Sequence, residues 1–221
     1  MTLLAASNKL ETELDILALE FSDFAASKPK LDSSSVFSLH DECLLEGLLS
    51  RVWQTWGHFC RACLFESCKG TSDANGKPIA ALPGALSDAH VSAAAIHAKK
   101  HKNNACWTGA TNNTLRYEPT WGDTAVAATC VPYLAPNNQA QLLSGFSAAS
   151  FFAKALQTIR NGAAHDNAET RADINAMQAP YIVFPITHPT QALFWVVPTT
   201  SSYLISAAID ELKAAAAIMI S

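Results

Sequence analysis

Residues 38–68 read SLHDECLLEGLLSRVWQTWGHFCRACLFESC, and this segment determines the fold class. Its apolar side chains recur every three or four residues, at Leu45, Leu48, Leu49, Val52, Trp56, Phe59, Cys60 and Cys63. That spacing is typical of an α-helix that buries one face. Ser38, with Asp41 and Glu42 in the turn that follows, is a suitable helix cap. The sequence therefore predicts a long amphipathic helix from Ser38 to Cys68.

Other segments extend this pattern on both sides. Helical patterns cover Asn8 to Ala26, Ser87 to Lys102, Asn137 to Arg160, Thr170 to Gln178 and Tyr203 to Ile220, and a further apolar pattern covers Gly122 to Leu134. Two short runs, Tyr181 to Phe184 and Ala192 to Val197, are typical of strands. Residues 69–86 and 103–122 predict irregular insertions, and Asp32 to Ser35 predicts a linker. We expect one domain over residues 1–221, a mostly α helical bundle with a small C-terminal β-hairpin.

The composition narrows the class of protein. Charged residues make up 15% of the chain, against roughly 25% in an ordinary globular domain, which suggests that a partner covers part of the surface. The net charge of −4 excludes a strong overall positive field, so a nucleic-acid site must be a local basic patch. The first residues lack the basic region of a signal peptide, and charges interrupt the apolar run 203–220. We therefore expect a cytoplasmic protein with no membrane segment.

The cysteines predict buried thiols. They lie at Cys43, Cys60, Cys63, Cys68, Cys106 and Cys130, and four of them fall within the predicted helix 38–68. Cys60 and Cys63 are spaced like half of a zinc site, but no second close pair completes one. The sequence also lacks a Gly-rich phosphate loop and a nucleophile elbow. We expect neither a metal nor another cofactor.

The residues that carry chemistry lie where the predicted helix 137–160 ends. They read Arg160-Asn161-Gly162-Ala163-Ala164-His165, followed by Asp166. RNA is cleaved without metal when its 2′-hydroxyl attacks the adjacent phosphorus, which requires proton transfer and positive charge on the phosphate. A histidine suits the proton transfer, an arginine suits bidentate contact with phosphate, and Asn161 can bind phosphate or orient the imidazole.

The spacing of the pair raises a geometric question. Residues five apart differ by about 140° around a straight helix, so Arg160 and His165 do not share a face. Gly162 lies between them and would permit a bend. The two side chains could then converge within one chain, or each could meet its counterpart across a dimer.

The segment Leu156 to Asp166 resembles the signature helix of the HEPN family (higher eukaryotes and prokaryotes nucleotide-binding domains). The resemblance implies a dimeric α-bundle with two motifs facing one cleft, and metal-independent endoribonuclease activity, often in toxin–antitoxin or anti-phage systems. It also implies that Arg160 and His165 are catalytic and that Asn161 is the polar residue after the arginine. Trp121 to Asp123 and Ala192 to Trp195 resemble an RNase-like bacterial subgroup of this family.

Two other interpretations of the motif stay open. In the first, Arg160 pairs with Asp166 or Glu169 and His165 caps the helix end. In the second, the chain is a catalytically inactive HEPN-like subunit that binds a partner protein or a nucleotide. A neighbouring antitoxin or defence protein is a possible partner in either case.

Basic residues outside the motif are candidates for contact with the RNA backbone. One polar face of the predicted helix 38–68 carries Arg51, Gln54, His58 and Arg61, and a second basic cluster contains Lys99, Lys100, His101 and Lys102. Both could be ordinary solvated surfaces. We predict RNA contacts at Arg51, His58, Arg61, Lys99, Lys100 and Lys102. His97 and His101 are spaced to share a metal, as a metal-dependent hydrolase would require, although the lysines between them oppose a cation.

Overall fold

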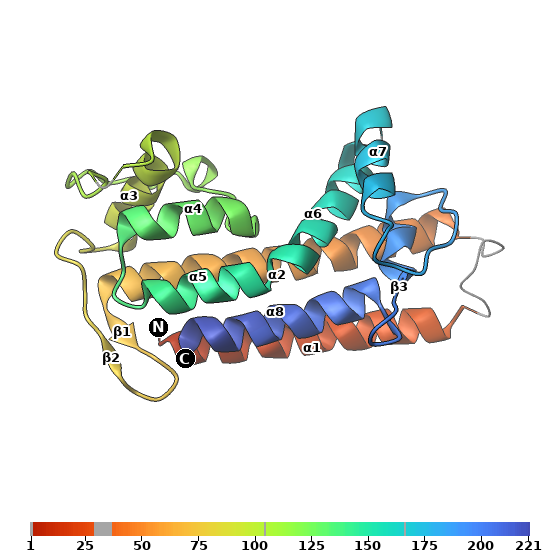
Figure 1. Cartoon of the computed structure of the whole chain (residues 1–221), viewed down its shortest axis with the longest axis horizontal. Helices are drawn as coiled ribbons and strands as arrows, with labels where there is room; N and C mark the ends of the chain where they lie inside the picture. The colour runs from red at the N-terminus through yellow and green to blue at the C-terminus, as the bar shows by residue number, and fades with distance from the viewer. Residues whose placement is uncertain (1, 29–36, 104, 166) are drawn as a thin grey trace. The chain divides into compact units, whose positions relative to one another are not determined.

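The computed structural model describes residues 2–28, 37–103, 105–165 and 167–221 and confirms a mostly helical protein (Figure 1). Its α-helices are α1 (Leu3–Ala26), α2 (Leu39–Lys69), α3 (Asp88–His101), α4 (Thr124–Leu134), α5 (Gln139–Ala148), α6 (Ser150–His165), α7 (Ala168–Ala176) and α8 (Leu204–Ile220). Two 3-10 helices are η1 (Leu115–Tyr117) and η2 (Pro189–Phe194). In these described segments, no helix is both long and apolar enough to cross a membrane. The predicted linker at 32–35 lies outside the described residues.

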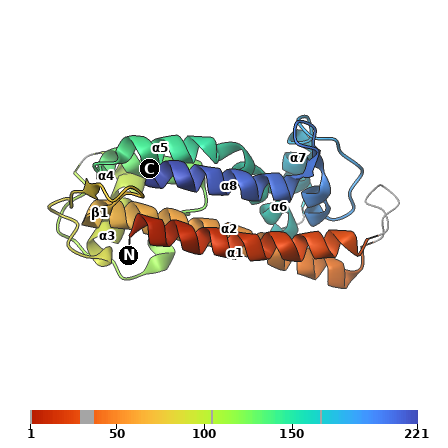
Figure 2. The same ribbon diagram turned by 90° about the horizontal axis from the view of Figure 1, so that it is seen from below.

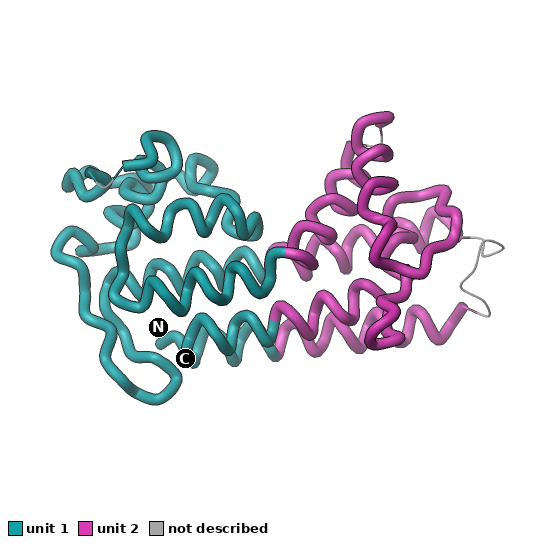
Figure 3. The backbone as a smooth tube through the Cα atoms, viewed as in Figure 1, with its two compact units in different colours: residues 1–11, 56–150, 213–221 teal, residues 12–55, 151–212 magenta. Residues whose placement is uncertain are grey.

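The chain forms two compact units, which Figure 3 colours separately. Unit 1 contains residues 1–11, 56–150 and 213–221, and therefore both predicted insertions. Unit 2 contains residues 12–55 and 151–212, and therefore the Arg160 motif and the C-terminal hairpin. The single domain over residues 1–221 stays a prediction.

Unit 1 is built on three successive helices. α3 packs against α4, and α4 packs against α5, so these helices lie side by side (Figures 1 and 2). All three helices carry buried apolar side chains, which include Val91, Cys130, Leu142 and Phe146. The insertion at 69–86 is not wholly irregular, because β1 (Thr71–Ser72) pairs antiparallel with β2 (Pro78–Ile79).

In unit 2, the long helix α2 begins as its sequence predicts. The backbone N–H of Ser38 donates to Asp41 Oδ2 at 2.8 Å, and the N–H of Asp41 donates back to Ser38 Oγ at 3.3 Å. This reciprocal pair satisfies two N–H groups that a helix start leaves without partners. Aromatic packing joins α1 to the C-terminal segment, since the rings of Phe21 and Phe194 lie 4.9 Å apart and Tyr203 meets Phe21 edge-on.

The predicted helix 137–160 is wrong as one helix, because it is interrupted at Ala149 and forms α5 and α6. The N–H of Ala149 still bonds to the carbonyl of Gly145, and Ser150 Oγ donates to the carbonyl of Ser147 at 2.8 Å. The hydroxyl of Ser150 thereby satisfies a carbonyl in the last turn of α5, where the helical hydrogen bonds end.

The two predicted strands, 181–184 and 192–197, are also wrong over most of their length. Ile182 and Val196 form a single antiparallel bridge, and the C-terminal hairpin instead pairs β3 (Val196–Val197) with β4 (Ser202–Tyr203). Residues 189–194 form η2, which Pro189 opens at a position where its missing N–H costs little. Ala192, Leu193, Phe194 and Trp195 are all buried, and a short apolar run cannot distinguish a strand from a buried helical turn.

Five of the six cysteines are buried thiols, as predicted, whereas Cys43 is exposed. Burial raises the pKa of Cys63 and of Cys68 to about 12. These two thiols therefore stay protonated near neutral pH and act as small apolar groups in the core.

Candidate functional site

The Arg160 motif occupies the last turns of α6, and the helix continues through Gly162 to His165. The bend that Gly162 would permit is therefore not found. Gly162 instead permits a close approach, because a Cβ there would lie 2.5 Å from Ile174 Cδ1 and 3.2 Å from Pro189 Cβ. The glycine brings α6 against α7 and η2, and the regular helix keeps Arg160 and His165 about 140° apart.

Arg160 lines a pocket between α6 and α2. The pocket is open to solvent and is bounded by Glu46, Leu49, Ser50, Arg160, Ala163 and Ala164. Its two alanines leave space beside the arginine. Arg160 makes no ion pair or hydrogen bond with any described residue, so its pairing with Glu169 is not found, while Asp166 lies outside the described part of the chain. A half-buried guanidinium in such a pocket can bind an anion.

The other two residues of the motif are placed differently. Asn161 is half-buried, and His165 is exposed at the end of α6. Neither residue lines the pocket of Arg160. Within one chain, the described geometry therefore does not bring the predicted proton-transfer group to the predicted phosphate-binding group.

Of two residues that the sequence analysis missed, one lies in the pocket of Arg160 and the other contacts the first. Glu46 shares its pocket, and His188 Nε2 lies 3.3 Å from Glu46 Oε1. The other ring nitrogen of His188, Nδ1, accepts the N–H of Thr190 at 3.4 Å and so caps η2. Glu46 and His188 are far apart in sequence and belong to no motif, so only the fold brings them together.

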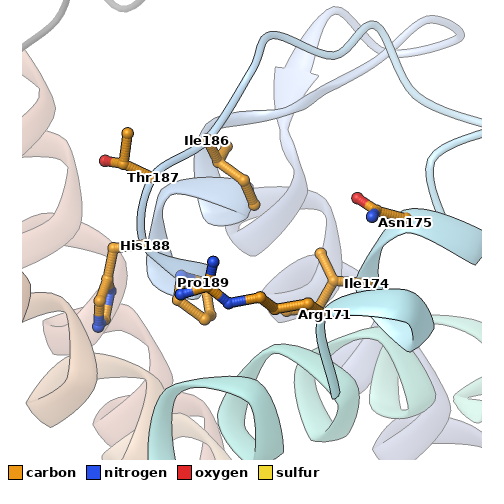
Figure 4. A pocket seen from close by; sticks show the side chains of 7 residues that line it. All are labelled: Arg171, Ile174, Asn175, Ile186, Thr187, His188 and Pro189. Atoms are coloured by element: carbon orange, nitrogen blue, oxygen red, sulfur yellow. The ribbon is translucent and has the colours of Figure 1, made fainter. Parts of the chain in front are cut away.

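His188 also borders a second pocket in unit 2 (Figure 4). This pocket is lined by Arg171, Ile174, Asn175, Ile186, Thr187, His188 and Pro189. Figure 4 shows Arg171 extending from α7 alongside Pro189. A cationic side chain, an amide and a hydroxyl thus surround a depression next to the Glu46–His188 pair.

Arg61 is held by an ion pair, which leaves its predicted contact with RNA without support. Its Nε and Nη2 donate to the two carboxylate oxygens of Glu118 at 2.7 and 2.9 Å, and its guanidinium lies 3.9 Å from the centre of the Phe65 ring. Burial by itself would lower the pKa of Arg61, but the hydrogen bonds and charge of Glu118 outweigh it and raise that pKa. Asp88 completes the pairing at 3.5 Å.

The remaining predicted RNA contacts are exposed side chains. Arg51 and His58 are exposed on α2, and Lys99 and Lys100 are exposed in the last turn of α3, where cations also favour the helix dipole. Lys102 caps that helix in the left-handed conformation, with φ of 50°. Arg51 belongs to unit 2 with the motif, whereas the others belong to unit 1, and their contacts with RNA stay predictions.

The histidines of α3 lie close together without forming a metal site. The ring centres of His97 and His101 are 4.4 Å apart. Among the residues that the structure describes, no three His, Cys, Asp or Glu side chains gather in a way that could hold a metal ion. The metal-dependent hydrolase interpretation therefore finds no third ligand beside this pair.

The segment Trp121 to Asp123, part of the narrower resemblance, has structural roles. Trp121 Nε1 donates to Glu118 at 2.8 Å, and Asp123 caps α4 by accepting the N–H groups of Ala125 and Val126. Trp195, in the other resembling segment, is fully buried. These residues therefore support the packing rather than the site.

Comparisons of the chain with family models, with curated proteins and with solved structures gave no match. The resemblance to HEPN domains consequently rests on the residues of the motif.

Proposed function

We propose that this protein is a metal-independent endoribonuclease of the HEPN type. The observation that carries the proposal is the position of Arg160. Its guanidinium has no partner among the described residues, lines a solvent-open pocket, and begins the sequence Arg160-Asn161-x-x-x-His165. Such a group is suited to bidentate contact with the non-bridging oxygens of a phosphodiester.

In the proposed reaction, the 2′-hydroxyl of the substrate attacks the adjacent phosphorus. The products are a 2′,3′-cyclic phosphate and a 5′-hydroxyl end. Arg160 stabilises the negative charge that develops on the phosphate, and Asn161 orients the substrate or the imidazole. His165 transfers a proton.

A homodimer is part of the proposal. Arg160 and His165 lie on different faces of a continuous helix, and His165 does not line the pocket of Arg160. A second copy related by a twofold axis can bring its own histidine to this pocket, which makes two equivalent sites. The resemblance further suggests a cytoplasmic toxin or anti-phage role, with an antitoxin or another defence protein as partner.

The same observation favours a second candidate function. A pocket that contains Arg160 but not His165 could bind the phosphate of a nucleotide without cleaving RNA. The protein would then be a HEPN-like binding subunit for a nucleotide or a partner protein.

A single assay separates the two candidates. Purified wild-type protein and His165→Ala are incubated with total RNA in excess EDTA, and the products are resolved on a denaturing gel. We expect discrete fragments with 2′,3′-cyclic phosphate ends from the wild type only. His165→Ala should keep its fold, checked by circular dichroism, because the side chain is exposed and alanine is the better helix former. RNA that stays intact with both proteins would refute the ribonuclease and favour the binding subunit.

A further inference from the structure

RNA transesterification requires two proton transfers on opposite sides of the phosphorus. One group removes the proton of the attacking 2′-hydroxyl, and another protonates the departing 5′-oxygen. The motif contains a single histidine for both tasks. A second proton-transfer group would have to come from the residues around Arg160.

Glu46 is the one carboxyl group among the described residues that line the pocket of Arg160. It lies one turn of α2 before Ser50, which lines the same wall, and Ala163 and Ala164 on the opposite wall leave the approach open. Its side chain is 45% exposed, so a substrate can reach it. The carboxylate and the guanidinium thus border one space from two different helices.

His188 contacts this carboxylate. Its Nδ1 lies 2.8 Å from Thr190 Oγ1 and accepts the N–H of Thr190 at 3.4 Å; with Nδ1 as the acceptor, we assign the ring proton to Nε2, the nitrogen that lies 3.3 Å from Glu46 Oε1. This contact engages one oxygen of Glu46. The other oxygen, Oε2, makes no hydrogen bond with a described residue and stays available as an acceptor.

We propose that Glu46 is the general base of the ribonuclease and that His188 is its positioning residue, an inference that rests on the proposed function. Glu46 accepts the proton of the 2′-hydroxyl as the bond between the 2′-oxygen and phosphorus forms. The bond between phosphorus and the 5′-oxygen breaks, and His165 of the second copy gives its proton to that oxygen. The proton taken up by Glu46 balances the one that His165 releases, and no further reactant is needed.

The test compares two substrates that differ in their leaving group. One is a short RNA that contains a mapped cleavage site, and the other carries sulfur in place of the 5′-bridging oxygen at that site. A thiolate leaves without protonation, so the sulfur substrate removes the need for a general acid but keeps the need for a base. We expect Glu46→Gln to slow single-turnover cleavage of both substrates by about 100-fold or more. His165→Ala should be slow on the oxygen substrate only.

Glu20→Gln is the matched control, because Glu20 is an exposed glutamate of unit 2 that lies outside the pocket. It should cleave both substrates at the wild-type rate. Rates for Glu46→Gln close to the wild type would overturn the role of Glu46 and leave the ribonuclease intact. Recovery of Glu46→Gln on the sulfur substrate would overturn its assignment as the base. A wild-type protein that cleaves neither substrate would refute the ribonuclease and this inference together.

Two variants of His188 distinguish its contact with Glu46 from its role as the cap of η2. His188→Gln keeps a donor where Nε2 lies but loses the cap of η2, whereas His188→Asn keeps an acceptor where Nδ1 lies but loses the contact with Glu46. We expect His188→Gln to be the more active variant and His188→Asn the more stable one. Higher activity of His188→Asn would show that His188 acts through the cap and would overturn its positioning role.

Discussion

Glu118→Gln should destabilise unit 1, because Glu118 is the buried counter-ion of Arg61. The Glu118 side chain is 3% exposed and accepts hydrogen bonds from Arg61 Nε at 2.7 Å, Arg61 Nη2 at 2.9 Å and Trp121 Nε1 at 2.8 Å. Glutamine offers one acceptor oxygen instead of two. Its NH2 group would face a donor, and the charge of Arg61 would lose its nearest counter-ion.

The expected magnitude follows from the burial of the two partners. Removing one partner of a fully buried ion pair costs about 3–5 kcal/mol. The Arg61 side chain is 25% exposed, and Asp88 lies 3.5 Å from its Nη1. Water and this second carboxylate therefore reduce the loss of stability. We therefore expect the free energy of unfolding to fall by about 2–3 kcal/mol. For a chain of this length, that corresponds to a decrease in Tm of about 4–12 °C.

Thermal and urea unfolding of wild type, Glu118→Gln and the control Glu20→Gln measure this loss. The effect should also depend on pH. Burial alone would raise the pKa of Glu118, but the hydrogen bonds from Arg61 and Trp121 outweigh it and hold that pKa below its ordinary value. The stabilisation is then present above the unfolded-state pKa and is lost as the pH falls through the folded-state pKa. A Tm unchanged at neutral pH, or a difference from wild type that grows in acid, would refute this reasoning.

Three further predictions concern the dimer, a glycine contact and a helix cap. Mixing Arg160→Ala with His165→Ala should restore about a quarter of wild-type ribonuclease activity after subunit exchange, because about half of the dimers are then mixed and each mixed dimer has one complete site of two. If the mixture stays inactive, the site is not shared between copies. Gly145→Ala should lower the free energy of unfolding by about 1–3 kcal/mol, because the added methyl group would overlap a core side chain and lie 2.8 Å from a backbone carbonyl oxygen. Gly47→Ala is the control, and because nothing lies within 4 Å of its added methyl group, it should raise the free energy of unfolding by about 1 kcal/mol. Equal urea midpoints for the two variants would count against the close contact at Gly145. Asp123→Ala should cost about 1 kcal/mol in urea unfolding through the lost cap of α4, and a variant as stable as wild type would show that the cap contributes nothing.

Much of the helical architecture could be predicted from local sequence. The period of apolar residues in 38–68 and the exchange between Ser38 and Asp41 are properties of adjacent turns, so α2 begins within one residue of its predicted start. The same reasoning found α3 and α8 to within a residue or two. It failed where periodicity stays continuous but the backbone does not, at Ala149, and where an apolar run is buried on all sides, at residues 192–195.

The candidate site, like the fold, could be predicted only in part. The sequence placed Arg160, Asn161 and His165 where a helix ends, and it left open whether a bend at Gly162 brings the arginine and the histidine together. The surroundings of each of them depend on the tertiary fold. The fold places Glu46 in the pocket of Arg160 and His188 against Glu46, pairs Arg61 with Glu118, and packs Gly162 against neighbouring side chains. Such contacts depend on side chains distant in sequence meeting across packed helices, which no local pattern specifies.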